Sequence, residues 1–280
     1  MTSSASHILL VDCPDERGLI FRITQVISSK GLNIYGNREF VDDMDHFFMR
    51  SEIIGALHAE QIIQELQNIL PATATIRLFE KRKKKIVVLA TKEHHCLSDL
   101  LVRNHFGDLP IEIQGVISNY DTLRDFTERL GIEFTHIPAE GMSREEHERE
   151  VMAAIRRYSY DYLVLAKYMR ILSPWFVAEF KNQIINIHHS FLPAFVGANP
   201  YKQAYERGVK LIGATAHFVN NDLDEGPIIA QSIIPVNHTY NATEMRKAGR
   251  DVEKIVLATA LKNVVEDRVF VRNNKTVLFD

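Results

Sequence analysis

From residue 86 onward, apolar segments of strand length alternate with segments of helical character. Four of the apolar segments are nearly continuous runs, at residues 86–90, 111–117, 162–166 and 184–187. Uninterrupted apolar strands between helices indicate a mostly parallel sheet that is covered on both faces. Ligands bind such sheets beyond the carboxyl ends of the strands. The residues that follow 184–187 are therefore the first place to look for a site.

The first 80 residues follow a different order, namely strand, helix, strand, strand, helix, strand. The six segments lie at residues 8–11, 19–29, 34–41, 46–53, 58–70 and 73–79, and residues 15–18 precede the first helix. Lys30-Gly31 ends the first helix as a C-cap does, and the turn at Asp42-Asp43 indicates a hairpin. This split βαβ order, βαββαβ, predicts a ferredoxin-like domain.

A basic run, KRKKK at residues 81–85, separates the two patterns. Basic runs can contact nucleic acid, but this one has no aromatic partners and lies directly between two strand-like segments. We therefore interpret it as a solvated linker. The predicted domains are residues 1–80 and 86–280, joined by 81–85, and the second domain closes with a hairpin at 269–279.

The composition is that of an ordinary soluble protein, with 46% hydrophobic and 25% charged residues. Because the net charge is only −3, we expect neither nucleic acid nor an anionic membrane as a partner. No stretch of about 18 apolar residues predicts a membrane span, and the first residues lack the pattern of a signal peptide. Cys13 and Cys96 are too few for a disulfide framework. We expect a cytoplasmic protein.

Four common catalytic signatures are missing from the sequence. It contains neither GxGxxG after a strand nor GxxxxGK[ST], so it has neither the dinucleotide fingerprint nor the P-loop. It also lacks HExxH and GxSxG, which removes the commonest metalloprotease and serine-hydrolase functions.

Asn186 and His188 stand at the end of the strand predicted at 184–187. Residues two apart in a strand point to the same face, so these side chains project together. An amide beside an imidazole can stabilise a developing oxyanion, and a carboxylate in the turn 222–227, such as Asp224, could relay protons. From these residues alone, a hydrogen-bonded structural pair remains the alternative. We expect His189 to point to the opposite face as a packing residue.

Three separated stretches resemble the folate-dependent formyltransferases, over about residues 85–265. They are Asn186-Ile187-His188-x-Ser190-x-Leu192-Pro193, His217-Phe218-Val219 followed by Asp224-x-Gly226-Pro227-Ile228-Ile229, and Met169-Arg170-Ile171-Leu172-Ser173-Pro174. The resemblance implies a Rossmann-like formyltransferase fold in which Asn186, His188 and Asp224 are catalytic. It also implies that two loops hold the folate, through Met169, Arg170, Ile171, Leu172, Val219, Asn220, Asn221 and Asp222.

The chemistry that this resemblance implies is acyl transfer from N10 of the folate. Asn186 and His188 would hydrogen-bond the formyl oxygen as it becomes an oxyanion. Asp224 would shuttle the proton between the nucleophile and the leaving nitrogen. Neither a metal nor a separate cofactor is required, since the folate is itself the substrate.

The segment after the first strand of this domain distinguishes two branches of the family. Members that act on a phosphorylated amine have a glycine-rich loop there, whose amides cradle the phosphate. Residues 90–97 of this chain contain no glycine, and Glu93 would repel a phosphate. His189, where the transferases usually have proline, resembles the deformylase branch, in which water takes the formyl group. The predicted reaction is hydrolysis of 10-formyltetrahydrofolate to formate and tetrahydrofolate, with His94 and His95 either lining the site or exposed in the loop.

The first domain resembles an ACT domain, a regulatory fold that commonly binds amino acids and pairs with its copies. An ACT domain ahead of a formyltransferase domain is the deformylase arrangement. The resemblance lies in residues 12–15, 17–19 and 31–34. It implies a homo-oligomer and an amino-acid effector, for which we expect glycine or methionine. The effector site would contain Asp12, Arg17, Gly18, Leu19 and Asn33. A structural module that binds nothing is the alternative.

The sequence leaves three other functions open. A formyltransferase that uses a non-phosphorylated amine would have the same three catalytic residues. A folate or amino-acid sensor would not need Asn186, His188 and Asp224 all intact. A metal-dependent amidohydrolase that uses His188, His189 and Asp224 is disfavoured, because adjacent residues of a strand point apart and chelate one ion poorly.

Overall fold

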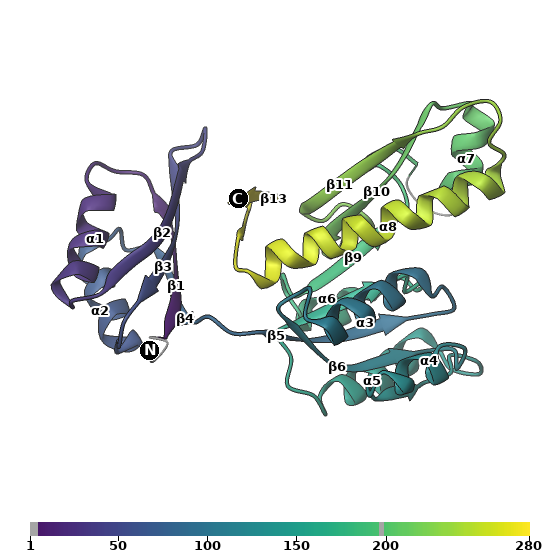
Figure 1. Ribbon diagram of the computed structural model, residues 1–280, viewed down its shortest axis with the longest axis horizontal. Coiled ribbons are helices and arrows are strands. Elements are labelled where there is room, and N and C mark those ends of the chain that lie inside the picture. Colours follow the sequence, from purple (N-terminus) through teal and green to yellow (C-terminus); the bar gives the residue numbers. More distant parts are fainter. Residues whose placement is uncertain (1–4, 196–198) are drawn as a thin grey trace. The chain divides into compact units, whose positions relative to one another are not determined.

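The computed structural model describes residues 5–195 and 199–280 (Figure 1). The chain forms two compact units. Unit 1 comprises the chain up to Arg82 together with Phe279 and Asp280, and unit 2 comprises Lys83–Leu278. The division falls inside the basic run. Phe279 and Asp280 group with unit 1, whereas the sequence pattern predicts that they belong to the second domain.

Unit 1 has the ferredoxin-like order that the sequence predicts. Its elements are β1 (Ser6–Pro14), α1 (Leu19–Ser29), β2 (Asn33–Val41), β3 (His46–Ile54), α2 (Ala59–Ile69) and β4 (Thr75–Glu80). The four strands form an antiparallel sheet in the order β2-β3-β1-β4. Helix α1 buries Leu19, Ile23 and Ile27, whose spacing of four residues places them on one face of the helix.

Unit 2 is built on a seven-stranded sheet in the order β11-β10-β9-β8-β5-β6-β7. Its elements up to β9 are β5 (Lys84–Ala90), α3 (His95–Phe106), β6 (Ile111–Ser118), α4 (Arg124–Arg129), β7 (Phe134–His136), α5 (Arg144–Ile155), β8 (Tyr162–Ala166), α6 (Pro174–Glu179) and β9 (Ile184–His188). The remaining elements are α7 (Pro200–Arg207), β10 (Leu211–Phe218), β11 (Ile228–Pro235), α8 (Ala242–Val265), β12 (Val269–Arg272) and β13 (Lys275–Leu278). Strands β5 to β9 are parallel, and β10 and β11 are antiparallel to their neighbours. The sheet is therefore mostly parallel, as predicted.

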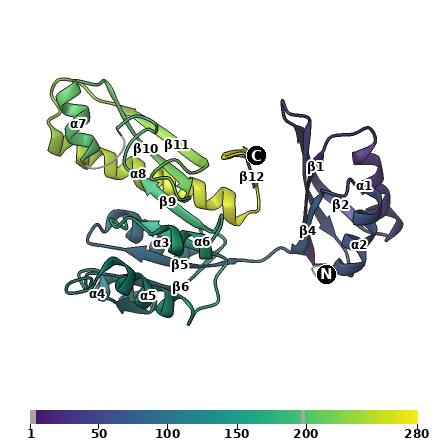
Figure 2. The same cartoon turned by 180° about the vertical axis from the view of Figure 1, so that it is seen from behind.

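Helices cover both faces of this sheet, which explains why its strands are continuous apolar runs. Alternate residues of β5 enter two different cores. Ile86 and Val88 pack with α3 and α8, whereas Val87 and Leu89 pack with α5 and α6. Helix α8 runs along β9, β10 and β11, as both views of the ribbon show (Figures 1 and 2).

The linker between the two units is shorter than the basic run 81–85 that the sequence predicts. Lys84 and Lys85 belong to β5, and the Lys84 side chain is buried, with its Nζ 2.9 Å from Asp267 Oδ2. A buried cation that is paired in this way is part of unit 2 and not of a solvated joint. The hairpin predicted at the end of the chain is confirmed as β12 and β13. None of the described helices combines the length and the hydropathy that a membrane span requires.

Candidate active site

The carboxyl end of β9 and the turn between β10 and β11 bring the three predicted catalytic residues together. Asn186 and His188 lie two apart on β9, and β10 pairs with β9 so that His217 faces Asn186. Asp224 lies in the turn after β10 and has a positive φ of 59°. This arrangement places an amide, two imidazoles and a carboxylate at the edge where ligands bind open α/β sheets.

His188 and Asp224 form a buried pair. His188 Nδ1 lies 3.3 Å from Asp224 Oδ2, and the two side chains are 6% and 8% exposed. His188 Nε2 is buried and has no hydrogen-bond partner among the described residues. With Nδ1 directed to the carboxylate, Nε2 is the nitrogen left for chemistry in the cavity.

His217 fixes the orientation of the Asn186 amide. His217 Nδ1 donates to the Phe218 carbonyl at 2.8 Å, so in the neutral ring Nε2 is an acceptor. Asn186 Nδ2 lies 3.2 Å from that Nε2 and donates to it. Burial lowers the pKa of His217 below its ordinary value, which keeps the ring in this neutral form. One N–H of the amide is thereby held, and the other is left for a ligand.

The Asp224 carboxylate is stabilised in its ionised form. Burial by itself would raise its pKa, but the hydrogen bond from His188 and the nearby charge of that ring lower the pKa below its ordinary value. Gly226 follows in the same turn, where a Cβ would meet the Phe218 carbonyl oxygen at 1.7 Å. Only glycine allows the two limbs of the turn to approach so closely.

A cavity of about 260 Å³ adjoins these groups. It is lined by all eleven catalytic and folate-binding residues predicted from the sequence: Asn186, His188, Asp224, Met169, Arg170, Ile171, Leu172, Val219, Asn220, Asn221 and Asp222. The predicted loops 169–172 and 219–222 thus lie against the same cavity as the three polar side chains. A largely apolar lining with a few convergent polar groups is typical of a small-molecule site.

Sequence reasoning missed seven further lining residues: Leu165, Lys167, Tyr168, Ile187, His189, His217 and Leu223. Of these, His217 was available in the sequence, because it belongs to one of the resembling stretches. Lys167 follows the apolar run of β8 and has a positive φ of 60°. That conformation is uncommon in residues other than glycine, and no pattern in the sequence predicts it.

The expectation that His189 points away from the site is wrong. Its ring lines the cavity and lies with its centroid 5.2 Å from that of His188. Strand β9 ends at His188, so the in–out alternation of a strand no longer applies to the next residue. Burial lowers the pKa of His189 to about 3, so the ring is neutral at physiological pH.

A second cavity of about 270 Å³ shares Lys167, Met169 and His189 with the first. Its wall contains a buried cluster centred on Glu253 of α8. Glu253 Oε2 lies 2.7 Å from His95 Nε2 and 3.2 Å from Lys167 Nζ, and the Tyr201 hydroxyl donates to Oε1 at 2.6 Å. His95 is therefore neither exposed nor a lining group of the first cavity, whereas His94 is exposed.

The Glu253 cluster is a poor candidate for a metal site. In the part of the chain that the structure describes, the donor atoms of His95, Cys96 and Glu253 lie within 4.8 Å of one another. The Lys167 ammonium already occupies one side of the carboxylate, and burial raises the pKa of the Cys96 thiol. A cation would have to displace one positive charge and deprotonate the Cys96 thiol, whose thiolate is disfavoured.

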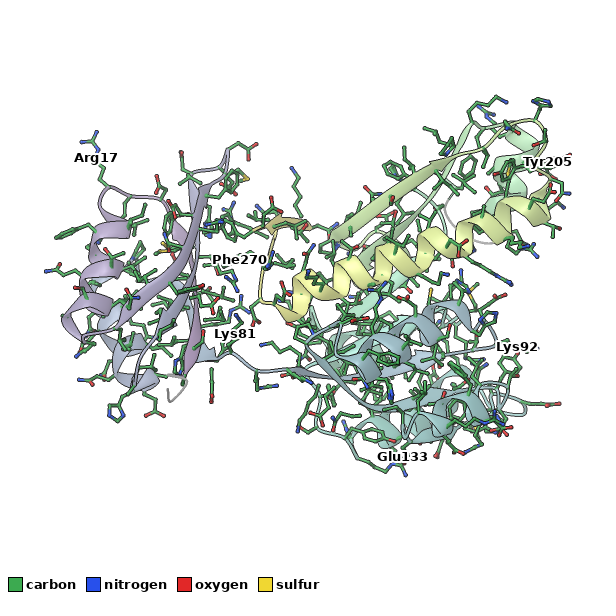
Figure 3. The ribbon with its side chains drawn as sticks, viewed as in Figure 1. Arg17, Lys81, Lys92, Glu133, Tyr205 and Phe270 are labelled. Atoms are coloured by element: carbon green, nitrogen blue, oxygen red, sulfur yellow. The ribbon has the colours of Figure 1, made fainter. Side chains whose placement is uncertain are left out.

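In unit 1 the structure separates the predicted effector residues. Gly18 and Leu19 line a cavity of about 450 Å³ at the turn before α1, and Asp12 lies near that end of β1, 3.3 Å from His46. Arg17 is exposed and projects away from the unit (Figure 3). Asn33 pairs with Ile54, as Ser6 does, at the opposite end of the sheet. Helix α1 runs back along β1, so the residue after it cannot share a site with Gly18.

Comparison with known proteins matches both units to protein families. The formyl transferase family model matches residues 84–261, and the ACT domain model matches residues 7–71. The first match includes every residue of the cavity that contains Asn186 and His188. Unit 2 is therefore a formyl transferase domain, and unit 1 is an ACT domain.

Relatives that span the whole chain are more specific. The formyltetrahydrofolate deformylase of Haemophilus influenzae is 53% identical over 97% of this chain and 98% of its own. That of Escherichia coli K12 is 52% identical over 99% and 100%. The chain belongs to the formyltetrahydrofolate deformylase family.

Solved structures agree with this assignment. A formyltetrahydrofolate deformylase from Pseudomonas syringae has a TM-score of 0.95 at 39% identity and covers 100% of this chain and 96% of its own. Glycinamide ribonucleotide transformylase 1 from Symbiobacterium toebii has a TM-score of 0.67 at 30% identity, and the alignment covers only 70% of this chain but 94% of that protein. The two kinds of relative share the formyl transferase fold.

Proposed function

We propose that this protein hydrolyses 10-formyltetrahydrofolate to formate and tetrahydrofolate. The observation that carries the proposal is the convergence of Asn186, His188 and Asp224 on a cavity lined by the two loops 169–172 and 219–222. The names of the full-length relatives support the same substrate. Folate is the substrate, and we propose that no metal or separate cofactor takes part.

The three side chains have distinct roles in the proposed mechanism. The amide N–H of Asn186 that His217 leaves free and the Nε2–H of protonated His188 donate to the formyl oxygen as it becomes an oxyanion. Asp224 accepts the proton of the attacking water as the new C–O bond forms. It hands that proton to N10 as the C–N10 bond breaks. The formyl carbon leaves as formic acid with the oxygen and the second proton of the water, and it loses that proton to solvent as formate. Tetrahydrofolate leaves with the first proton on N10.

The loop after β5 supports water as the acceptor. Thr91 donates from its hydroxyl to the Lys167 carbonyl at 2.7 Å, and Glu93 binds Arg250 at 2.8 Å. His95, the first residue of α3, is committed to Glu253. The side chains of Thr91, Glu93 and His95 thus bind the protein's own groups, and residues 90–97 offer none of the glycine amides that cradle a phosphorylated acceptor.

Isotope transfer tests the reaction directly. Purified protein is mixed with 10-formyltetrahydrofolate in ¹⁸O-labelled water without any amine. We expect one formate for each tetrahydrofolate, and each formate should carry one ¹⁸O atom. Activity that requires an added amine, or formate without the label, would favour the alternative of formyl transfer to a non-phosphorylated acceptor.

We propose further that a small amino acid, glycine or methionine, binds unit 1 and changes the activity. The cavity beside Gly18 supports this, because Asp15 and Glu39 also line it and suit an ammonium group. The N-terminus of α1 suits the carboxylate of the same molecule. An effector can act only through different affinities for two states, which typically gives ~1–3 kcal/mol of coupling.

Calorimetry with glycine and methionine, alongside assays of activity, tests the effector. Binding that disappears in Glu39→Gln but persists in Asn33→Ala would support the cavity beside Gly18. Absence of binding by either amino acid would leave unit 1 as a structural module.

We also propose that the protein is a homo-oligomer and that it is cytoplasmic. Sedimentation of the full chain tests the oligomeric state.

A further inference from the structure

The hairpin of β12 and β13 lies beyond the region that the formyl transferase model matches, yet it holds the turn that carries Asp224. Asn274 Nδ2 donates to the Glu225 carbonyl at 2.7 Å. Asn274 Oδ1 accepts from Asn220 Nδ2 at 3.3 Å. One side chain therefore binds both limbs of the turn, on either side of Asp224.

The turn holds Asp224 in an uncommon backbone conformation. Asp224 has a φ of 59°, which an aspartate adopts only at a cost in conformational energy. The base of the turn is closed by the hydrogen bond from Phe218 N to the Pro227 carbonyl, at 2.9 Å. At the tip, where Asp224 meets His188, the turn has a longer backbone hydrogen bond of its own, from Glu225 N to the Asp222 carbonyl at 3.2 Å.

Asn274 is itself held in a defined position. Asn273 and Asn274 are the two central residues of the hairpin turn, with φ values of 49° and 59°. Two consecutive positive φ angles are typical of a type I′ turn, in which asparagine is favoured. The hairpin is anchored nearby by Thr276, whose hydroxyl donates to the Ile228 carbonyl at 2.6 Å.

The Asn220 side chain extends the same network towards the cavity. Its Oδ1 accepts from the Asp222 backbone N–H at 3.1 Å, and its Nδ2 donates to Asn274. Asn220 and Asp222 both line the cavity proposed to bind the folate. A displacement of Asn274 would therefore reach both the folate-binding limb and the Asp224 limb.

We propose that Asn274 is a positioning residue for the deformylation reaction: its amide clasps both limbs of the 219–227 turn and holds Asp224 in reach of His188. The inference rests on the proposed function, because it assigns Asn274 a part in that reaction. It places one requirement for activity outside the formyl transferase module, in the last residues of the chain.

Two glycine variants distinguish the loss of the Asn274 side-chain hydrogen bonds from a change in the hairpin turn itself. Asn274→Gly removes both side-chain hydrogen bonds, while glycine keeps the positive φ that the type I′ turn needs. Asn273→Gly makes the same change at the neighbouring position and leaves the Asn274 amide in place. We expect Asn274→Gly to lower kcat/KM about tenfold, the size expected for two ordinary hydrogen bonds. The loss should be divided between a higher KM for the folate and a lower kcat.

The control and the thermal midpoint decide the interpretation. Asn273→Gly should leave kcat and KM close to those of the wild type, because both Asn274 hydrogen bonds remain, and both variants should unfold cooperatively within a few degrees of the wild-type temperature. Equal losses in the two variants, or kinetics of Asn274→Gly that match the wild type, would overturn the clasp. If the wild-type protein itself releases no formate, the proposed function fails instead, so the two failures are distinguishable.

Discussion

His217 on β10 faces Asn186 across the antiparallel pair with β9, and its Nε2 lies 3.2 Å from the Asn186 amide nitrogen. The acceptor role of Nε2 is set by the bond from Nδ1 to the Phe218 carbonyl. The amide oxygen of Asn186 is thereby excluded from that position. The orientation of the proposed oxyanion donor thus depends on a residue that need not touch the substrate.

Replacing His217 should consequently impair turnover more than binding. Phenylalanine in His217→Phe keeps an aromatic ring at this position but has no acceptor nitrogen. The Asn186 amide is then free to rotate. Removing an oxyanion donor outright typically costs ~10²–10³-fold in kcat, and we expect about 10–100-fold for a donor that is only misoriented. Steady-state kinetics measure this loss. His217→Gln, which restores an acceptor oxygen, should recover part of it, and equal kcat in the two variants would contradict the orienting role.

Asp224→Asn should abolish most turnover and leave folate binding largely intact. The amide keeps the size of the side chain but cannot accept and pass on the proton of the attacking water, and losing such a relay typically costs ~10²–10⁴-fold. Titration with tetrahydrofolate, followed by fluorescence, measures the binding separately from kcat. A variant with near-normal turnover would remove Asp224 from the mechanism.

Much of the site was predictable because its residues lie close together along the chain or belong to recognisable stretches. Asn186 and His188 share one strand face by simple alternation, and apolar runs gave the positions of β5, β6, β8 and β9. The type of sheet followed from the continuity of those runs. The prediction of eleven lining residues rested on resemblance as well as on these patterns.

The incorrect predictions concern residues just beyond the end of a helix or strand, or residues whose partner is far away in the sequence. His189 faces the cavity because β9 ends one residue earlier. Asn33 cannot join Gly18 because α1 reverses the chain direction between them. His95 is paired with Glu253, 158 positions away, and no spacing rule connects two such residues. These features depend on where elements end and how they pack, which periodicity does not specify.

Residues 83–278 should fold alone and retain hydrolysis of the folate. Unit 2 contains its complete sheet and the hydrophobic cores on the two faces of that sheet, and the buried pair of Lys84 and Asp267 lies within it. Cooperative urea unfolding, together with the formate assay, checks this expectation. A fragment that begins at residue 86 is the matched control, because it leaves Asp267 without Lys84 and should be less stable. An insoluble 83–278 fragment would show that unit 2 depends on unit 1.

Glu253 should make the stability of unit 2 depend on pH in the acid range. Burial alone would raise its pKa, but the hydrogen bond from His95 and the charge of Lys167 lower it to about 2. A carboxyl whose pKa is lower in the folded state contributes stability above its unfolded pKa, near ~4.3, and loses that contribution as the pH falls through the folded value. Glu253→Gln should therefore lower the free energy of unfolding at pH 7 by on the order of 3 kcal/mol, and the difference from the wild type should shrink between about pH 4.5 and pH 2. Urea unfolding of both proteins across this range measures the effect.

The double variant Lys167→Met with Glu253→Gln should be more stable at pH 7 than Glu253→Gln, because the single variant leaves a buried ammonium unpaired. A difference that stays constant with pH would show that the ionised carboxylate is not the source of the stability.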